Sequence, residues 1–182
     1  RAFGQKLIGS VTRKVKLAPG ASAKATFLIA WHMPNLKLQG LPPGRYYATR
    51  FASAVAVTQY VRKEFARLSR DTRLWHDTWY DSTMPYWFID RTFLNTSILA
   101  TSTCHRFASG RFYGWEGVGC CEGTCGHVWQ YAHAVARLFP ELERTTRETV
   151  DFGLAQQPDG SIHFRGERDR IPAIDAQSGT IL

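Results

Sequence analysis

The chain of 182 residues is 44% hydrophobic and 13% aromatic, and it carries a formal net charge of +8. This apolar content excludes a disordered segment, and the length is sufficient for a domain with its own core. The charge suggests nucleic acid as a partner, but Lys and Arg are spread along the sequence, and no RNP, helix-turn-helix or zinc-finger spacing accompanies them. We therefore expect no nucleic-acid partner.

The first predicted elements are two β-strands. Apolar and polar residues alternate over 11–17 and again over 23–31, and Pro19-Gly20 supplies a turn between them. A hairpin alone is marginally stable in water, so we expect it to belong to a larger sheet with strands upstream of Arg1. We assign residues 1–38 to the C-terminal strands of a β-domain.

A segment rich in Pro and Gly, 39–44, opens a predicted linker over 39–48. Beyond it the hydrophobic period changes to about 3.6, which indicates helices. The predicted helices are 51–68, 74–80, 85–105 and 128–139. Another helix is predicted to begin at Pro140, with Glu141 and Glu143 in its first turn. The inner side of this helix is predicted to be formed by Leu142, Thr146 and Val150. Pro158-Asp159-Gly160 predicts a turn. Residues 49–182 are therefore expected to be all-α.

Residues 114–127 form the stretch with the most concentrated chemistry: GWEGVGCCEGTCGH. The glycines permit tight reversals and a close approach of the backbone to a ligand. The helical pattern that follows predicts an irregular loop that leads into a helix N-terminus, where free N–H groups face the loop. We expect the functional site here.

The cysteines of this loop allow two interpretations besides packing. Cys120, Cys121, Cys125 and His127 offer zinc ligands, but the familiar structural spacing with a second pair is missing. Cys125 with His127 could form a thiol nucleophile and its base, whereas small cysteines also fill space under a glycine-rich loop. We favour packing and predict no metal. Because the four cysteines cluster instead of joining distant loops, we expect reduced thiols and a cytoplasmic protein.

The carboxylate of Glu116 is the best candidate for chemistry, because it lies between Trp115 and Gly117 in this loop. Glycosidic cleavage needs one carboxylate as nucleophile or base and a second carboxyl as acid. An isolated loop Glu is also often solvated and inert. His127 can equally donate to a ligand hydroxyl or bond to the backbone.

Two motifs resemble glycoside hydrolase family 116, the β-glucosidases and non-lysosomal glucosylceramidase-like proteins. They are WHDTWYDSTMP at 75–85 and the segment from Trp115-Glu116-Gly117 to Trp129. The segments 44–51 and 138–143 resemble the same family. The resemblance covers nearly the whole chain, and these motifs are specific as a set.

The resemblance implies a mainly α fold: a fragment of an (α/α)6 barrel catalytic domain preceded by the last strands of an N-terminal β-sandwich. It also implies retaining hydrolysis of a β-glycoside without cofactor, with Glu116 as nucleophile. The family's acid/base is an Asp in a later segment, which we expect beyond Leu182. The isolated fragment is therefore expected to be inert, and its partners are a carbohydrate or glycolipid substrate and the rest of its own chain. Membrane association stays open.

The sequence departs from the family pattern at two positions. His127 stands where glucosylceramidase-like members have an Asp that contacts the sugar, and Asp175-Ala176-Gln177 resembles a variant of an Asp-Gly-Gln motif. We expect Trp115 to form a pocket wall, and His127 and Asp175 to bind sugar hydroxyls. An inactive carbohydrate-binding relative of the same fold is the alternative, and a zinc-stabilised interaction module is a third.

Overall fold

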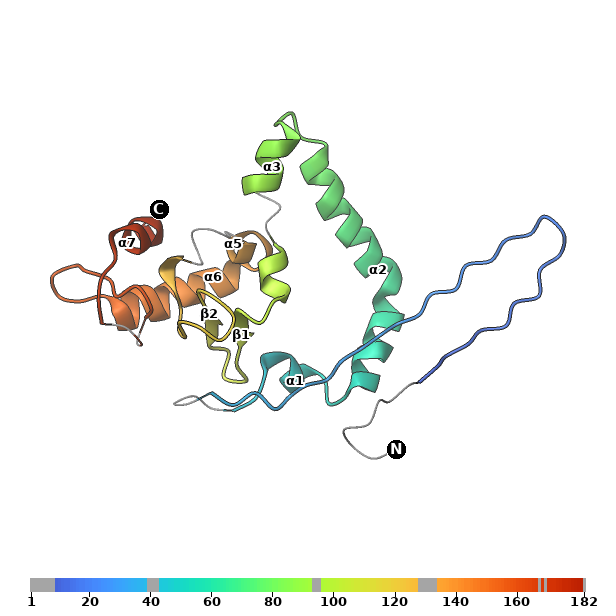
Figure 1. The fold of residues 1–182 in the computed structure, drawn as a ribbon, viewed down its shortest axis with the longest axis horizontal. Helices are drawn as coiled ribbons and strands as arrows, with labels where there is room; N and C mark the ends of the chain where they lie inside the picture. Colours follow the sequence, from blue (N-terminus) through green and yellow to red (C-terminus); the bar gives the residue numbers. More distant parts are fainter. Residues whose placement is uncertain are drawn as a thin grey trace.

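A computed structural model describes residues 9–38, 43–92, 96–127, 134–166, 168 and 170–181. It is mainly α-helical, with one small antiparallel sheet. In Figure 1 the short strands lie below α5 and α6, with α7 to their left, while the long α2 and the segment before α1 extend away from this group. The mainly α character predicted from the sequence is confirmed.

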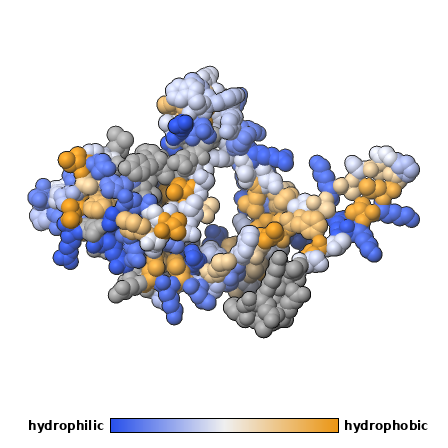
Figure 2. Space-filling view, viewed as in Figure 1, coloured by the Kyte–Doolittle hydropathy of each residue, from blue (hydrophilic) through white to orange (hydrophobic). Residues whose placement is uncertain are grey.

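The N-terminal segment 9–38 is extended but forms no strand within the described residues. It runs out and back around a turn at Gly20, where the amide of Ala21 donates to the Ala18 carbonyl at 3.0 Å. The turn is thus confirmed, whereas the predicted pairing of 11–17 with 23–31 is not formed. Nearly all of this segment is exposed, and Figure 2 shows hydrophobic residues along it. The prediction was wrong because two strands without a partner layer gain little from pairing.

The helix α1 (Tyr46–Arg50) begins within the segment assigned to the linker, and α2 (Ala54–Tyr80) follows. Ser53 caps α2, since its hydroxyl accepts from the amide of Ala56 at 3.2 Å. The two predicted helices 51–68 and 74–80 are one helix, because no Gly or Pro separates them. None of its residues is buried, so its apolar stripe is uncovered. The domain boundaries themselves stay a prediction.

The predicted helix 85–105 is much shorter in the structure. Pro85 precedes α3 (Tyr86–Thr92), and after residues outside the described set comes a 3-10 turn, η1 (Ser97–Ala100). The hydroxyl of Thr101 donates to the Ile98 carbonyl at 2.6 Å and competes with further helical bonding. The chain then becomes extended, so the helix predicted to reach His105 was wrong there.

The small sheet pairs β1 (Cys104–Arg106) with β2 (Phe112–Gly114), in the register His105 opposite Tyr113. Gly110, at φ +92, makes the reversal between them. Tyr113 of β2 forms a buried cluster with Phe107 and Trp115, which follow the two strands. This hairpin was not predicted, and it fixes the start of the glycine-rich loop.

The helices after the loop follow the predicted pattern. The first part of the predicted helix 128–139 lies outside the described residues, and its last part is α5 (Ala134–Leu138). Pro140 opens α6 (Pro140–Thr146), which continues as the π-helix η2 (Arg147–Ala155). Thr146 and Val150 are buried, and Leu142 packs against Phe112 and Val135. The predicted inner side of this helix is confirmed.

The last segment returns to the glycine-rich loop. The predicted turn at 158–160 is present, and the bridges Gln156–Ile162 and His163–Pro172 replace a regular strand. The final helix, α7 (Ile174–Ile181), follows. Within the part of the chain that the structure describes, none of the helices combines the length and apolar character that a membrane span requires.

Candidate functional site

The glycine-rich loop 114–127 is tied to its neighbours by backbone hydrogen bonds. The amide of Trp115 donates to Thr103 at 2.7 Å, and the amide of Cys125 donates back to Gly114 at 3.0 Å. The amide of Gly126 then donates to Phe164 at 2.8 Å. The loop is therefore closed on itself beside β2 and fastened to the segment before α7.

Two glycines allow the close approach on that side. A Cβ on Gly126 would lie 2.7 Å from the Cβ of Ala176 in α7, and a Cβ on Gly123 would lie 2.8 Å from the carbonyl oxygen of Arg165. Gly123 also has φ +119, a conformation that L side chains rarely adopt. The sequence folds in this way because only glycine lets the two segments touch.

Glu116 projects from the loop, and its side chain is 44% exposed. Its Oε2 accepts a hydrogen bond from Nη2 of Arg165 at 2.8 Å. This contact, followed by a hydrogen bond from the Cys121 thiol, lowers the pKa of the Glu116 carboxyl below its usual value. The carboxylate is held ionised in a defined position.

His127 lies at the end of the loop and meets α7. Its Nε2 lies 3.2 Å from Oδ1 of Asp175, in the first turn of that helix. The imidazole also packs at a tilt against the ring of Phe164, with 5.2 Å between the ring centroids. One side of the ring is thereby fixed by a carboxylate and the other by an aromatic ring.

The predicted site residues meet at this point, with one exception. One potential ligand atom each of Glu116, Cys125 and His127 lies within 4.8 Å of the others, and Asp175 contacts His127 from outside. Trp115 is only 7% exposed and belongs to the core cluster with Phe107 and Tyr113. The structure thus places its ring in the core, and its role as a pocket wall stays a prediction.

Arg165, the partner of Glu116, was not predicted from the sequence. It lies 49 positions away, in a charged loop with no motif. Arg168 of the same loop approaches Glu122 at 3.7 Å, so both carboxylates of the glycine-rich loop have arginine partners. The only indication of these ion pairs in the sequence is the number of arginines in the charged loop before α7.

None of the four cysteines forms a disulfide in the structure. The Sγ atoms of Cys120 and Cys121 lie 2.6 Å apart. This contact, together with burial and the hydrogen bond to Glu116, raises the pKa of the Cys121 thiol to about 11. Cys121 is consequently a poor thiolate nucleophile at neutral pH.

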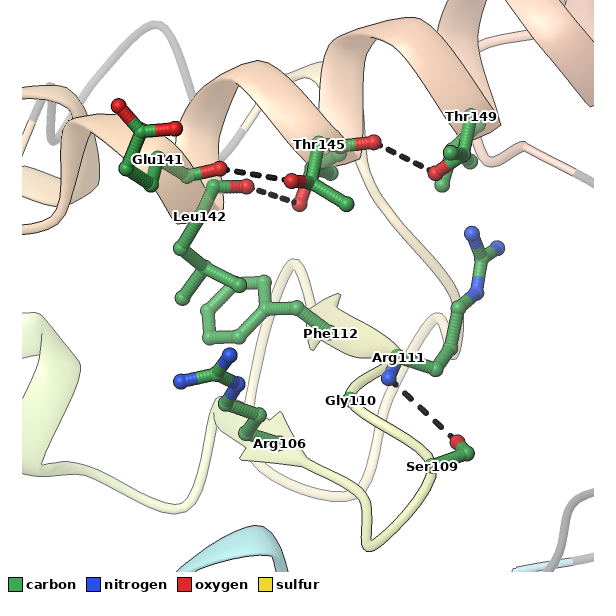
Figure 3. A pocket seen from close by; sticks show the side chains of 11 residues that line it. Arg106, Ser109, Gly110, Arg111, Phe112, Glu141, Leu142, Thr145 and Thr149 are labelled. Carbon is green, nitrogen blue, oxygen red and sulfur yellow. Dashed lines mark hydrogen bonds between the residues drawn. The ribbon is translucent and has the colours of Figure 1, made fainter.

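A separate cavity of about 410 Å³ lies between the β1–β2 turn and the helices α6 and η2 (Figure 3). The hydroxyls of Thr145 and Thr149 face it but donate to helix carbonyls, and Arg106 stacks over Tyr46 with its Cζ 3.6 Å from the ring centroid. Neither Glu116 nor any other predicted site residue lines this cavity. We therefore place the candidate site at the glycine-rich loop and not at this cavity.

Comparison with known families supports the resemblance noted in the sequence. Residues 2–68 match the family model described as beta-glucosidase 2, glycosyl-hydrolase family 116 N-term. The match covers well under half of the chain, so it shows that residues 2–68 are similar to the N-terminal region of the glycoside hydrolases of this family. No curated protein matches the chain. The match ends within α2, before all of the candidate site residues.

Proposed function

We propose that the protein is a retaining β-glycoside hydrolase of the β-glucosidase or glucosylceramidase-like type, with Glu116 as its nucleophile. The observation that carries the proposal is the convergence of Glu116 and His127, from the two ends of the glycine-rich loop, with Asp175 of α7 in contact with His127. The family match supports the reaction class. The site residues are supported by their positions in the motifs.

The geometry suits the first step of retaining hydrolysis. The nucleophile must be ionised to attack the anomeric carbon, and the Arg165 guanidinium beside Glu116 favours that form. The bond from the anomeric carbon to the leaving oxygen then breaks as the Glu116 ester forms. We assign His127 and Asp175, whose Nε2 and Oδ1 atoms lie 3.2 Å apart, to hydrogen bonds with sugar hydroxyls.

Retaining hydrolysis also needs an acid/base about 5–5.5 Å from the nucleophile. Asp175 contacts His127, and we assign it to substrate binding. From the family resemblance we propose that the acid/base is an Asp located after Leu182, so that the 182-residue chain alone does not turn over substrate. The (α/α)6 barrel and the β-sandwich are proposed on the same basis. We propose a cytoplasmic location because the four cysteines cluster in the sequence.

The test compares two carboxylates of the same loop in the full-length protein. Glu116→Gln should lower kcat for an aryl β-glucoside by a factor on the order of 10⁴ or more, as removal of a nucleophile does in other enzymes. Glu122→Gln, which alters the exposed carboxylate facing Arg168, is the matched control and should stay within a few-fold of the natural protein. Equal activity of all three proteins would refute the assignment.

A further inference from the structure

Glu116 and His127, which we assign to hydrolysis, also form a second arrangement together with Cys125. A carboxylate oxygen of Glu116, Sγ of Cys125 and a ring nitrogen of His127 lie within 4.8 Å of one another. Oxygen, sulfur and nitrogen ligands in this combination are those that zinc binds, at about 2.0–2.3 Å from the metal. Atoms arranged around one ion at these distances are about 3–4 Å apart, so only small side-chain shifts are required.

Each of the two polar ligands already has an outer partner. Asp175 contacts Nε2 of His127 at 3.2 Å, and Arg165 donates to Oε2 of Glu116 at 2.8 Å. Metal-binding imidazoles and carboxylates are commonly oriented by such contacts. Asp175 and Arg165 would orient His127 and Glu116 toward an ion in the same way.

Cys125 supplies the third ligand from the buried side of the loop. The residue is fully buried, and its amide is fixed to Gly114 at 3.0 Å. Spacing in the sequence disfavoured zinc because the cysteines and His127 lack a second pair of ligands. In the fold, Glu116 takes the place of the missing ligand pair. A zinc site with three protein ligands and one open position is accessible to other molecules, whereas a structural zinc site has four protein ligands and is closed.

We propose that Glu116, Cys125 and His127 form a binding site for one divalent ion of the zinc class, such as Zn²⁺, Cd²⁺ or Co²⁺. The ion binds as the Cys125 thiol releases its proton to solvent, and it takes a water molecule at the open position. Because Glu116 then gives a lone pair to the metal, the occupied site has no free nucleophile. This consequence rests on the proposed function, whereas the binding itself does not.

The test is a titration of the full-length, metal-free protein with CdCl2, followed by ultraviolet absorption from the thiolate-to-cadmium transition. We expect one ion per chain and loss of the absorption in Cys125→Ala. The matched control is Cys104→Ala, which alters the half-buried thiol of β1 and should retain the absorption. Asp175→Asn, a change of an exposed residue, should weaken Cd²⁺ binding about 10- to 100-fold.

Absorption that survives in Cys125→Ala, or that is lost when Cys120 and Cys121 are replaced instead, would overturn the proposed ligand set. Binding of Cd²⁺ at full affinity by Asp175→Asn would do the same.

Enzyme activity provides a separate test: ZnCl2 should abolish aryl β-glucoside hydrolysis in proportion to the occupancy of the site, and a chelator should restore it. If the ion binds but the metal-free protein is inactive, the glycosidase proposal fails and the metal site stands. If the protein hydrolyses the glucoside but does not bind Cd²⁺, the metal site fails and the glycosidase proposal stands.

Discussion

Nη2 of Arg165 lies 2.8 Å from Oε2 of Glu116, across 49 positions of sequence. This ion pair joins the glycine-rich loop to the charged loop before α7, and it orients the carboxylate that we assign as nucleophile. Arg165 also stacks over the ring of Phe164, with its Cζ 4.5 Å from the centroid. The guanidinium is therefore held on two sides.

The first prediction concerns Arg165. Arg165→Met removes the charged hydrogen bond to Glu116, a contact of about 1.5–3 kcal/mol, and should lower kcat/KM of the full-length protein roughly 10- to 100-fold. Arg168→Met, which alters the looser partner of Glu122, should change kcat/KM by less than a few-fold. Steady-state kinetics on an aryl β-glucoside measures both. Equal losses in the two variants would assign the effect to net charge and not to the ion pair.

The second prediction concerns the contact between the loop and α7. Gly126→Ala places a methyl group 2.7 Å from the Cβ of Ala176, so it should lower the free energy of unfolding by about 1–3 kcal/mol or displace Asp175 from His127. Gly117→Ala is the control, because its added methyl meets nothing closer than 3.8 Å. Chemical denaturation measures the change.

A second substitution makes the contact between Gly126 and Ala176 specific. Ala176→Gly in the Gly126→Ala background removes the opposing methyl group and should recover much of the lost stability. Failure of this double variant to recover would mean that the conformation of residue 126, and not contact with α7, requires glycine.

The third prediction is a pH dependence of stability through His105. Burial, followed by the positive charge of Arg45, lowers the pKa of this imidazole in the folded protein. As pH falls below the unfolded value of about 6.5, the unfolded chain binds a proton that the folded chain resists. The free energy of unfolding should therefore decrease between about pH 7 and pH 5, and less so in His105→Phe. Urea denaturation at several pH values checks this, and parallel profiles for the two proteins would contradict it.

The sequence predicted local features where one residue type determines the outcome. Pro140 with Glu141 and Glu143 opens α6 as expected, and Asp159-Gly160 makes its turn. Errors arose where contacts distant in sequence decide. His105 resembles part of a helix by periodicity, but the pairing with Tyr113 draws it into a strand.

The candidate site was predictable in part. Glu116, His127 and Asp175 were expected from motifs, and the fold brings them together. The role of Arg165 was not predictable, because the sequence around an arginine in a charged loop does not indicate which carboxylate it will pair with. Cys125 was interpreted as packing because its approach to Glu116 depends on the loop closing at Gly114, which no spacing rule expresses.

The most direct test of the central proposal is to trap the covalent intermediate. The full-length protein is incubated with a 2-deoxy-2-fluoro-β-glucoside that has a good leaving group, and its peptides are analysed by mass spectrometry. We predict one fluoroglucosyl ester per chain, located on Glu116 and absent from Glu116→Gln. Label on another carboxylate, or hydrolysis of the aryl β-glucoside by Glu116→Gln at the natural rate, would contradict the assignment of Glu116 as nucleophile.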